Sequence, residues 1–345
     1  MEEPAGSNGT AMTEQMYVEE LKPAGVTQQY PIIFWPGMCQ TGVSWLTTPD
    51  GRRGWASYFL GQGFIVYLVD PPERGRSAWL PKSSTVITVS SEYAEKFWTA
   101  TQENGGLWPQ AKLLTQWPGI GRRGDPVFDV FMASQVQSRN DYLAAETLAQ
   151  QLGALLLERV GPAILCTHSQ GCSHGWAMAD TASDFVRAIV ALEPAGPPFV
   201  NRVASAVRQP DPSHVVRPYG ITMVPITYEP PILGPSDLST VITLSTHSNL
   251  CDQILQAEPA RRLAKLSRVP VLIVTSESGY HAHYDYATVD YLKQAGVLVE
   301  WLNLPDLGVK GNGHFMFMER NNFEIAEIVH NWLLTLGSAI EAAGR

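Results

Sequence analysis

Short apolar runs alternate along the chain with stretches whose apolar residues recur every three or four positions. The runs are the right length for buried strands, and they cover residues 31–35, 64–70, 162–168, 188–193, 269–276 and 297–304. The helical spacing predicts helices over 140–160, 170–181, 257–267, 286–295 and 321–336. Continuous apolar strands that alternate with helices are typical of a mostly parallel sheet covered by helices on both faces, so we predict an α/β fold.

Two long segments interrupt this alternation. Residues 71–139 and 194–251 are rich in Pro and Gly and show little regular period. Each follows the carboxyl end of a predicted strand, where ligands bind in open α/β sheets, and long insertions of this kind are usually lids or binding loops. We therefore predict a single domain over 15–345 with both insertions as a lid or cap, preceded by disordered polar residues 1–14.

The segment ILCTHSQGCSHG places a serine, Ser169, between a predicted strand and a predicted helix. A nucleophile elbow needs this context, because a sharp turn there lifts the serine hydroxyl above the sheet, and small residues follow as the close packing requires. Thr167 replaces the first glycine of the G-x-S-x-G pattern. The alternative is that Ser169 only caps the following helix, a position where serine is favoured.

The other members of a catalytic triad can be placed in the order that this fold requires, which is serine, acid and histidine. His314 lies in GVKGNGHFMF, between the last predicted strand and the last helix, where the general base belongs. The acid has two candidates, Glu193 and Glu277, both at the ends of strands. We favour Glu193 because its strand neighbours that of Ser169 and the following EPAGPP turn is rigid, while Glu277 remains an alternative.

The same reasoning assigns the remaining parts of a pocket. The backbone amides of Met38 and Gln170 are the expected oxyanion hole, since one follows an early strand and the other follows the nucleophile. Tryptophans are the candidates for an apolar substrate-binding surface, and they are Trp35, Trp79, Trp98, Trp108 and Trp117.

Net charge and composition limit the classes of partner that this protein is expected to bind. The formal net charge of −9 argues against a nucleic-acid surface and favours a small-molecule substrate. No window is apolar enough to span a bilayer, and the amino terminus has no secretory signal pattern. The four cysteines have no zinc-ligand spacing, which predicts free thiols in a reducing, cytoplasmic compartment. The sequence leaves open whether the protein forms a homodimer.

No cofactor or metal ion is expected. His281, His283 and Asp285 lie close together in the sequence, as metal ligands often do, but no third histidine is spaced to complete a set. We interpret this segment as a loop that lines the pocket.

From about Pro31 to the C-terminal helix, the chain resembles the α/β-hydrolase superfamily, on the strength of the elbow and the histidine loop. More narrowly, WPGMCQTGVSWLTTPDGRRGW, LEPAGPP and LGVKGNGHFMFMERNN are similar to a subgroup of bacterial and fungal esterase-like hydrolases. In that subgroup the acid is a glutamate after the strand that follows the nucleophile helix, which supports Glu193. Pro36-Gly37 stands where members commonly carry His-Gly, and Met38-Cys39 replaces a pair of adjacent cysteines, so a vicinal disulfide is impossible here.

The resemblance implies a serine hydrolase that cleaves a carboxylic ester or lactone through a Ser-His-Glu triad and an acyl-enzyme. Because this fold hosts other chemistry, two alternatives stay open. One is a cyclase, lyase or acyltransferase that acts on a bulky biosynthetic intermediate beneath the aromatic lid. The other is a non-catalytic ligand-binding module.

Overall fold

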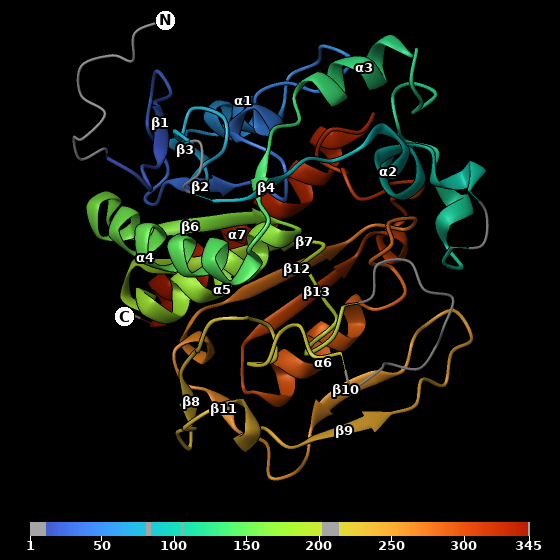
Figure 1. Cartoon of the computed structure of the whole chain (residues 1–345). Helices are drawn as coiled ribbons and strands as arrows, with labels where there is room; N and C mark the ends of the chain where they lie inside the picture. Colours follow the sequence, from blue (N-terminus) through green and yellow to red (C-terminus); the bar gives the residue numbers. More distant parts are fainter. Residues whose placement is uncertain (1–11, 81–83, 105–106, 202–213, 344–345) are drawn as a thin grey trace, which may run out of the picture.

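A seven-stranded sheet forms the centre of the molecule, in a computed structural model that describes residues 12–80, 84–104, 107–201 and 214–343 (Figure 1). Its strand order is β1-β3-β2-β6-β7-β12-β13, with β1 antiparallel to β3 and all other neighbours parallel. The strands are β1 Tyr17–Leu21, β2 Ile32–Trp35, β3 Val66–Asp70, β6 Ala163–His168, β7 Val186–Leu192, β12 Val271–Thr275 and β13 Val299–Asn303. The predicted mostly parallel α/β fold is confirmed.

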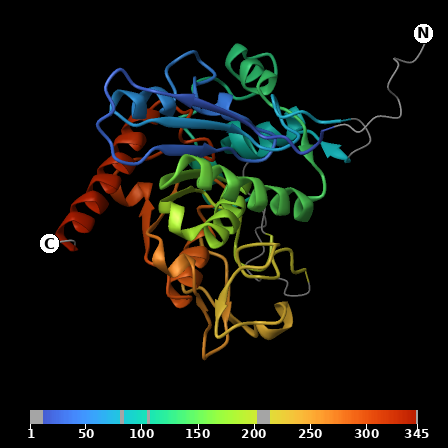
Figure 2. The same ribbon diagram turned by 90° about the vertical axis from the view of Figure 1, so that its left-hand side faces the viewer.

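Helices cover both faces of this sheet. Alternate side chains of β2 show the two layers, because Ile32 and Phe34 join one apolar core and Ile33 and Trp35 join the other. The first core contains α1 Trp55–Gly61 and α7 Asn322–Ala343; the second contains α4 Tyr142–Val160, α5 Gln170–Thr181 and α6 Asp285–Gln294. Figures 1 and 2 show α4 and α5 side by side. Burial on both faces explains why the strands are continuously apolar.

Local signals set the ends of α4, the helix that leads into the nucleophile strand. The Asp141 carboxylate accepts a hydrogen bond from the Ala144 amide at the start of the helix. Gly161 ends it with a φ of 84°, a conformation that favours glycine. Within the described part of the chain, no helix combines the length and apolar character needed to cross a bilayer.

The predicted helix over 257–267 is wrong. Arg262–Leu263 is instead a short strand, β11, that pairs with β8 Tyr228–Glu229, and a single 3₁₀ turn, Leu266–Arg268, follows it. The Gln256 side chain accepts a hydrogen bond from the Arg261 N–H and donates one to the Arg261 C=O. These two backbone groups therefore do not form the hydrogen bonds of a helix. Leu263 and Leu266 are both fully buried, and their spacing imitated a helical face.

Both predicted insertions contain short regular elements. The first carries β4 Val86–Ile87, α2 Ser91–Ala94, a π-helical turn Glu95–Thr99, α3 Pro126–Ala133 and β5 Ser138–Arg139. The second carries β8 and β9 Thr240–Thr243, which pairs with β10 Gln253–Gln256. In the views of Figures 1 and 2 the first insertion lies above the second. Of the predicted disordered start, residues 1–11 lie outside the described residues, as do residues 202–213 of the second insertion.

Candidate active site

The candidate site lies where the strand order reverses. From β2 the chain passes to β3 on one side of it and later returns to β6 on the other side. Trp35 at the end of β2 is paired with Thr167 near the end of β6. The loops after these two strands therefore leave the same edge of the sheet, next to each other, which is the usual place for a ligand in such a sheet.

Ser169 occupies the turn between β6 and α5 with a φ of 54° and a ψ of −123°. A side chain in this region costs on the order of 1–3 kcal/mol and persists only where the surroundings fix it. Here the Ser169 amide donates to Leu192 O at 3.0 Å, and its carbonyl accepts from the Ala195 amide at 3.1 Å. The hydroxyl makes no hydrogen bond to the helix amides. Ser169 is thus held on a strained elbow, and its side chain does not act as a helix cap.

Glycines allow the two loops to approach each other. A β-carbon on Gly171 would lie 2.5 Å from Pro36 O, and one on Gly37 would lie 2.9 Å from His168 Nδ1. Real β-carbons do not come that close to other atoms. The close contact of the loop after β2 with the end of β6 and the first turn of α5 therefore requires glycine at both positions.

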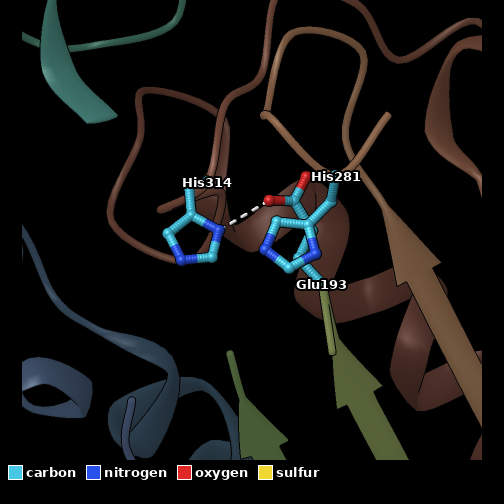
Figure 3. Close-up of side chains that lie close together, drawn as sticks. All are labelled: Glu193, His281 and His314. Carbon is cyan, nitrogen blue, oxygen red and sulfur yellow. Dashed lines mark hydrogen bonds and ion pairs between the residues drawn. The ribbon is translucent and has the colours of Figure 1, made fainter. Parts of the chain in front are cut away.

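His314 links the two other predicted members of the triad. Its Nδ1 lies 2.7 Å from Glu193 Oε2, and its Nε2 lies 3.1 Å from Ser169 Oγ. Figure 3 shows the imidazole and the Glu193 carboxylate facing each other. A carboxylate at Nδ1 assigns the proton of the neutral ring to that nitrogen, so the lone pair of Nε2 faces the serine hydroxyl. This arrangement suits Nε2 to accept the proton of Ser169.

The Glu193 carboxylate is fully buried and is fixed from a second side. Its Oε1 accepts hydrogen bonds from the amide of Ser276, at 3.1 Å, and from the Ser276 hydroxyl. A β-carbon on Gly279 would lie only 2.3 Å from Oε1, so the carboxylate is tightly enclosed. Burial raises the pKa of Glu193, and the Ser276 hydrogen bonds oppose this rise. The alternative acid, Glu277, instead accepts from the Gly311 amide at 2.7 Å.

The site also favours an uncharged imidazole. Burial lowers the pKa of His314 well below its ordinary value, and repulsion from a protonated His281 acts in the same direction. His168 contacts the same loop, with Nε2 2.9 Å from His314 O, and burial lowers its pKa as well. His314 can thus serve as a base at neutral pH, and His168 holds the backbone of the His314 loop through its hydrogen bond.

Two further side chains contact His314, and nothing in the sequence singled out the first of them, Tyr280. Tyr280 places its hydroxyl 3.2 Å from His314 Nε2, within reach of the same lone pair as Ser169. His281 stacks on His314 at 4.9 Å between ring centroids, and its Nδ1 lies 3.1 Å from Asp285 Oδ1. The HAHYD segment does therefore line the pocket through His281, as we interpreted it.

One ligand atom each from Glu193, His281 and His314 lies within 4.8 Å of the other two (Figure 3). These groups are of the types that bind transition metals. However, the 2.7 Å contact between His314 and Glu193 is a hydrogen-bond distance, and a cation would have to displace the proton that makes it. The geometry therefore fits a proton-transfer pair better than a metal centre.

The predicted oxyanion loop is held by a buried arginine from the first insertion. Arg74 donates from Nη1 to Gly37 O at 2.6 Å and from Nη2 to Gln170 Oε1 at 2.7 Å. Because the N–H of a trans peptide points opposite to its C=O, this contact directs the Met38 N–H away from Arg74. Among the described residues, no acceptor receives a hydrogen bond from the Met38 or the Gln170 amide. Both amides are free to bind an oxyanion.

Of the five candidate tryptophans, Trp98 lines the cavity above Ser169, where it stacks at 6.3 Å on His314. The others have different surroundings: Trp35 donates to His174, Trp79 to Ser84 and Trp108 to the Ser278 carbonyl, while Trp117 packs on Phe131. Large aromatic side chains are as common in a core as in a pocket, and sequence alone did not separate the two.

Comparison with known proteins finds a related sequence and similar solved structures. No protein-family model matches it. The probable secreted lipase phiG of Fungal sp. (strain ATCC 74256) is 48% identical over 320 residues, which cover 92% of this chain and 85% of that protein. The structure of a bacterial esterase is similar in fold, with a TM-score of 0.60 at 22% identity, over 94% of this chain and 86% of that one. The chain belongs to the α/β-hydrolase superfamily. The resemblance drawn from the sequence is thereby confirmed.

The expected cytoplasmic location of this α/β-hydrolase is wrong, because its fungal relative is named a secreted lipase. The expectation rested on four cysteines taken as thiols of a reducing compartment. All four are free and buried in the structure. Buried thiols are unreactive whatever the compartment, so they carry no information about location.

Proposed function

We propose that this α/β-hydrolase cleaves a carboxylic ester or lactone with Ser169 as nucleophile, His314 as general base and Glu193 as the orienting acid. The observation that carries the proposal is the position of the His314 ring, 3.1 Å from Ser169 Oγ on one side and 2.7 Å from Glu193 Oε2 on the other. The name of the fungal relative, a lipase, supports an ester as the substrate.

In the first half of the reaction, Ser169 Oγ attacks the carbonyl carbon while His314 Nε2 takes its proton. The carbonyl π electrons move onto oxygen, and Glu193 stabilises the imidazolium. When the tetrahedral intermediate collapses, the alkoxide leaves with the proton from His314. Water then gives a proton to His314 and attacks the acyl-enzyme, which releases the acid and restores Ser169.

The amides of Met38 and Gln170 form the oxyanion hole in this proposal. Donors fixed before the reaction stabilise the developing charge without reorganisation, and the loss of one typically costs 10²- to 10³-fold in kcat. Arg74 fixes both sides of the hole, because it binds the peptide that carries the Met38 amide and the side chain of Gln170.

The two insertions form the cover of the pocket. Tyr93 and Trp98 from the first insertion and Gly196 and Arg217 from the second line the same cavity as Ser169. A cover of this kind excludes water from the reacting carbonyl while an apolar group is bound.

The proposal also includes secretion of this protein, because its fungal relative is named a probable secreted lipase.

A fluorophosphonate probe together with a panel of p-nitrophenyl esters tests the proposal. The parent enzyme should be labelled and should hydrolyse at least one ester, whereas Ser169→Ala should lose both labelling and about 10³-fold or more of the activity. Ser57→Ala, the same change on the remote helix α1, is the control. Equal labelling of Ser169→Ala and the parent would overturn the nucleophile assignment. Turnover by Ser169→Ala without an acyl intermediate would favour the cyclase or lyase alternative.

A further inference from the structure

A buried arginine, Arg217, lines the cavity above Ser169 and is only 4% exposed. Its Nη2 donates to Pro197 O at 2.7 Å and also to Val200 O, which ties it to the loop that follows Glu193. Its Nε is buried and has no acceptor among the described residues. Nη2 of the guanidinium is therefore anchored to backbone, while the N–H of Nε is left without a hydrogen bond to the described residues.

No carboxylate in the described part of the protein lies close enough to Arg217 to form an ion pair with it. Glu146, which also lines the cavity, attracts Arg217 through its charge without touching it, and its Oε1 accepts hydrogen bonds from the amides of Met223 and Val224. Burial lowers the pKa of Arg217 to about 10, which leaves the guanidinium charged at neutral pH. Arg74, the other buried arginine at this site, likewise binds only a carbonyl and an amide side chain.

Burying an uncompensated charge is expensive, so buried cations are normally paired. At an enzyme cavity the missing counter-ion can come with the ligand. A planar guanidinium matches a carboxylate because two N–H groups can bind the two oxygens together.

We propose that Arg217 binds a carboxylate carried by the substrate, so that the preferred ester is a monoester of a dicarboxylic acid or a similar anionic ester. This inference rests on the proposed function, since it places the anionic group and the reacting carbonyl in one cavity. It also narrows the substrate class, because a neutral lipid ester would leave the buried Arg217 without an anion in direct contact.

Two esters with the same leaving group test this inference, p-nitrophenyl butyrate and mono-p-nitrophenyl glutarate. The parent should show the higher kcat/KM for the glutarate. Arg217→Gln should lower kcat/KM for the glutarate by about 10- to 100-fold, the range for a hydrogen bond to a charged group, and for the butyrate by less than about threefold. Arg217→Lys keeps the positive charge but lacks the two parallel N–H groups of the guanidinium, so its kcat/KM for the glutarate should lie between those of the parent and Arg217→Gln. Arg159→Gln, the same change on the exposed side of α4, should behave as the parent.

Equal kcat/KM of the parent for the two esters, or an equal loss for both in Arg217→Gln, would overturn the carboxylate site. Calorimetry with glutarate separates this failure from failure of the proposed function. Glutarate should bind to Ser169→Ala and lose about tenfold or more in affinity when Arg217→Gln is added, whether or not any ester is hydrolysed. If Ser169 proves necessary for hydrolysis but glutarate does not bind, only the Arg217 inference is wrong.

Discussion

Thr167 and Gly175 share one space beneath the nucleophile: a β-carbon at position 175 would lie 2.9 Å from Thr167 Cγ2. Thr167 occupies the position at which the elbow pattern has its first glycine. Its methyl group fits because α5 has no side chain at 175, and its hydroxyl donates to Val190 O at 3.2 Å. The glycine missing from one side of the strand–helix contact is thus compensated by a glycine on the other side.

This relationship predicts the effect of Gly175→Ala. In a helix interior this change normally stabilises by up to about 1 kcal/mol, but here the crowded methyl groups should reverse the sign and destabilise the protein by about 1–3 kcal/mol. In a Thr167→Ala background the nearest remaining atom, Cβ, is 3.7 Å away, and the same change should become neutral or stabilising. Urea unfolding of the four proteins measures this coupling; additive effects of the two changes would contradict it.

The assignment of the acid predicts unequal effects of two conservative changes. Glu193→Gln removes the negative charge that stabilises the imidazolium and should lower kcat by about 10³- to 10⁴-fold, as tautomer-disrupting changes do in other triads. Glu277→Gln keeps an oxygen that can accept from the Gly311 amide and should lower kcat by less than about fivefold. Steady-state kinetics on one ester gives both values. A larger loss in Glu277→Gln would make our choice of acid wrong.

The sequence predicted the fold well where burial on both faces made the strands continuously apolar. The six predicted strands all lie in the central sheet, and they correspond to β2, β3, β6, β7, β12 and β13. It failed over 257–267, where pairing of Arg262 with Glu229 and of Leu263 with Tyr228, both far earlier in the chain, decided the conformation. The edge strand β1 was also missed, because its exposed and half-buried residues YVEEL have no apolar run.

The site was predictable as far as chain order and strand ends could define it, which covers Ser169, His314 and the two candidate acids. Arg74 could not be predicted, because its role depends on contacts with Gly37, 37 positions earlier in the chain, and with Gln170, 96 positions later. Its only sequence signal is its position shortly after the end of β3, a strand that neighbours β2, where the strand order reverses. The same is true of Arg217, whose sequence surroundings do not show that it is buried.

Arg74 should act as a positioning residue for the oxyanion hole. Arg74→Met removes the contact that orients the Met38 peptide while keeping a side chain of similar length, so kcat should fall by about 10- to 100-fold with little change in KM. Arg74→Lys, which can keep only one of the two contacts, should be intermediate. Fluorophosphonate titration gives the concentration of intact sites and excludes partial unfolding as the cause. Arg53→Met, the same change at an exposed arginine, is the control and should keep the kcat of the parent. If Arg74→Met lowers only the thermal stability and leaves kcat unchanged, the prediction is wrong.

The loop that carries His314 depends on a second buried carboxyl group. Glu319 accepts hydrogen bonds from the Gly313 amide at 2.9 Å and from Asn312 Nδ2 at 2.7 Å. Burial raises the pKa of Glu319 to about 8, against about 4.3 in an unfolded chain. Between these values the folded state keeps a proton that the unfolded state has lost. The stabilisation from this proton is therefore complete below about pH 4 and disappears as the pH rises to about 8.

Glu319→Gln should consequently flatten the dependence of stability on pH, because glutamine stays neutral. From pH 6 to pH 8 the free energy of unfolding of the parent should fall by about 2 kcal/mol more than that of Glu319→Gln, at a limit of about 1.4 kcal/mol per pH unit. Burial also raises the pKa of Glu146, to about 7, but this contribution is present in both proteins and cancels in the difference. Urea unfolding at pH 6, 7 and 8 measures the slopes, with the exposed Glu327→Gln on α7 as control. Parallel slopes for the parent and Glu319→Gln would show that Glu319 is ionised in the folded protein.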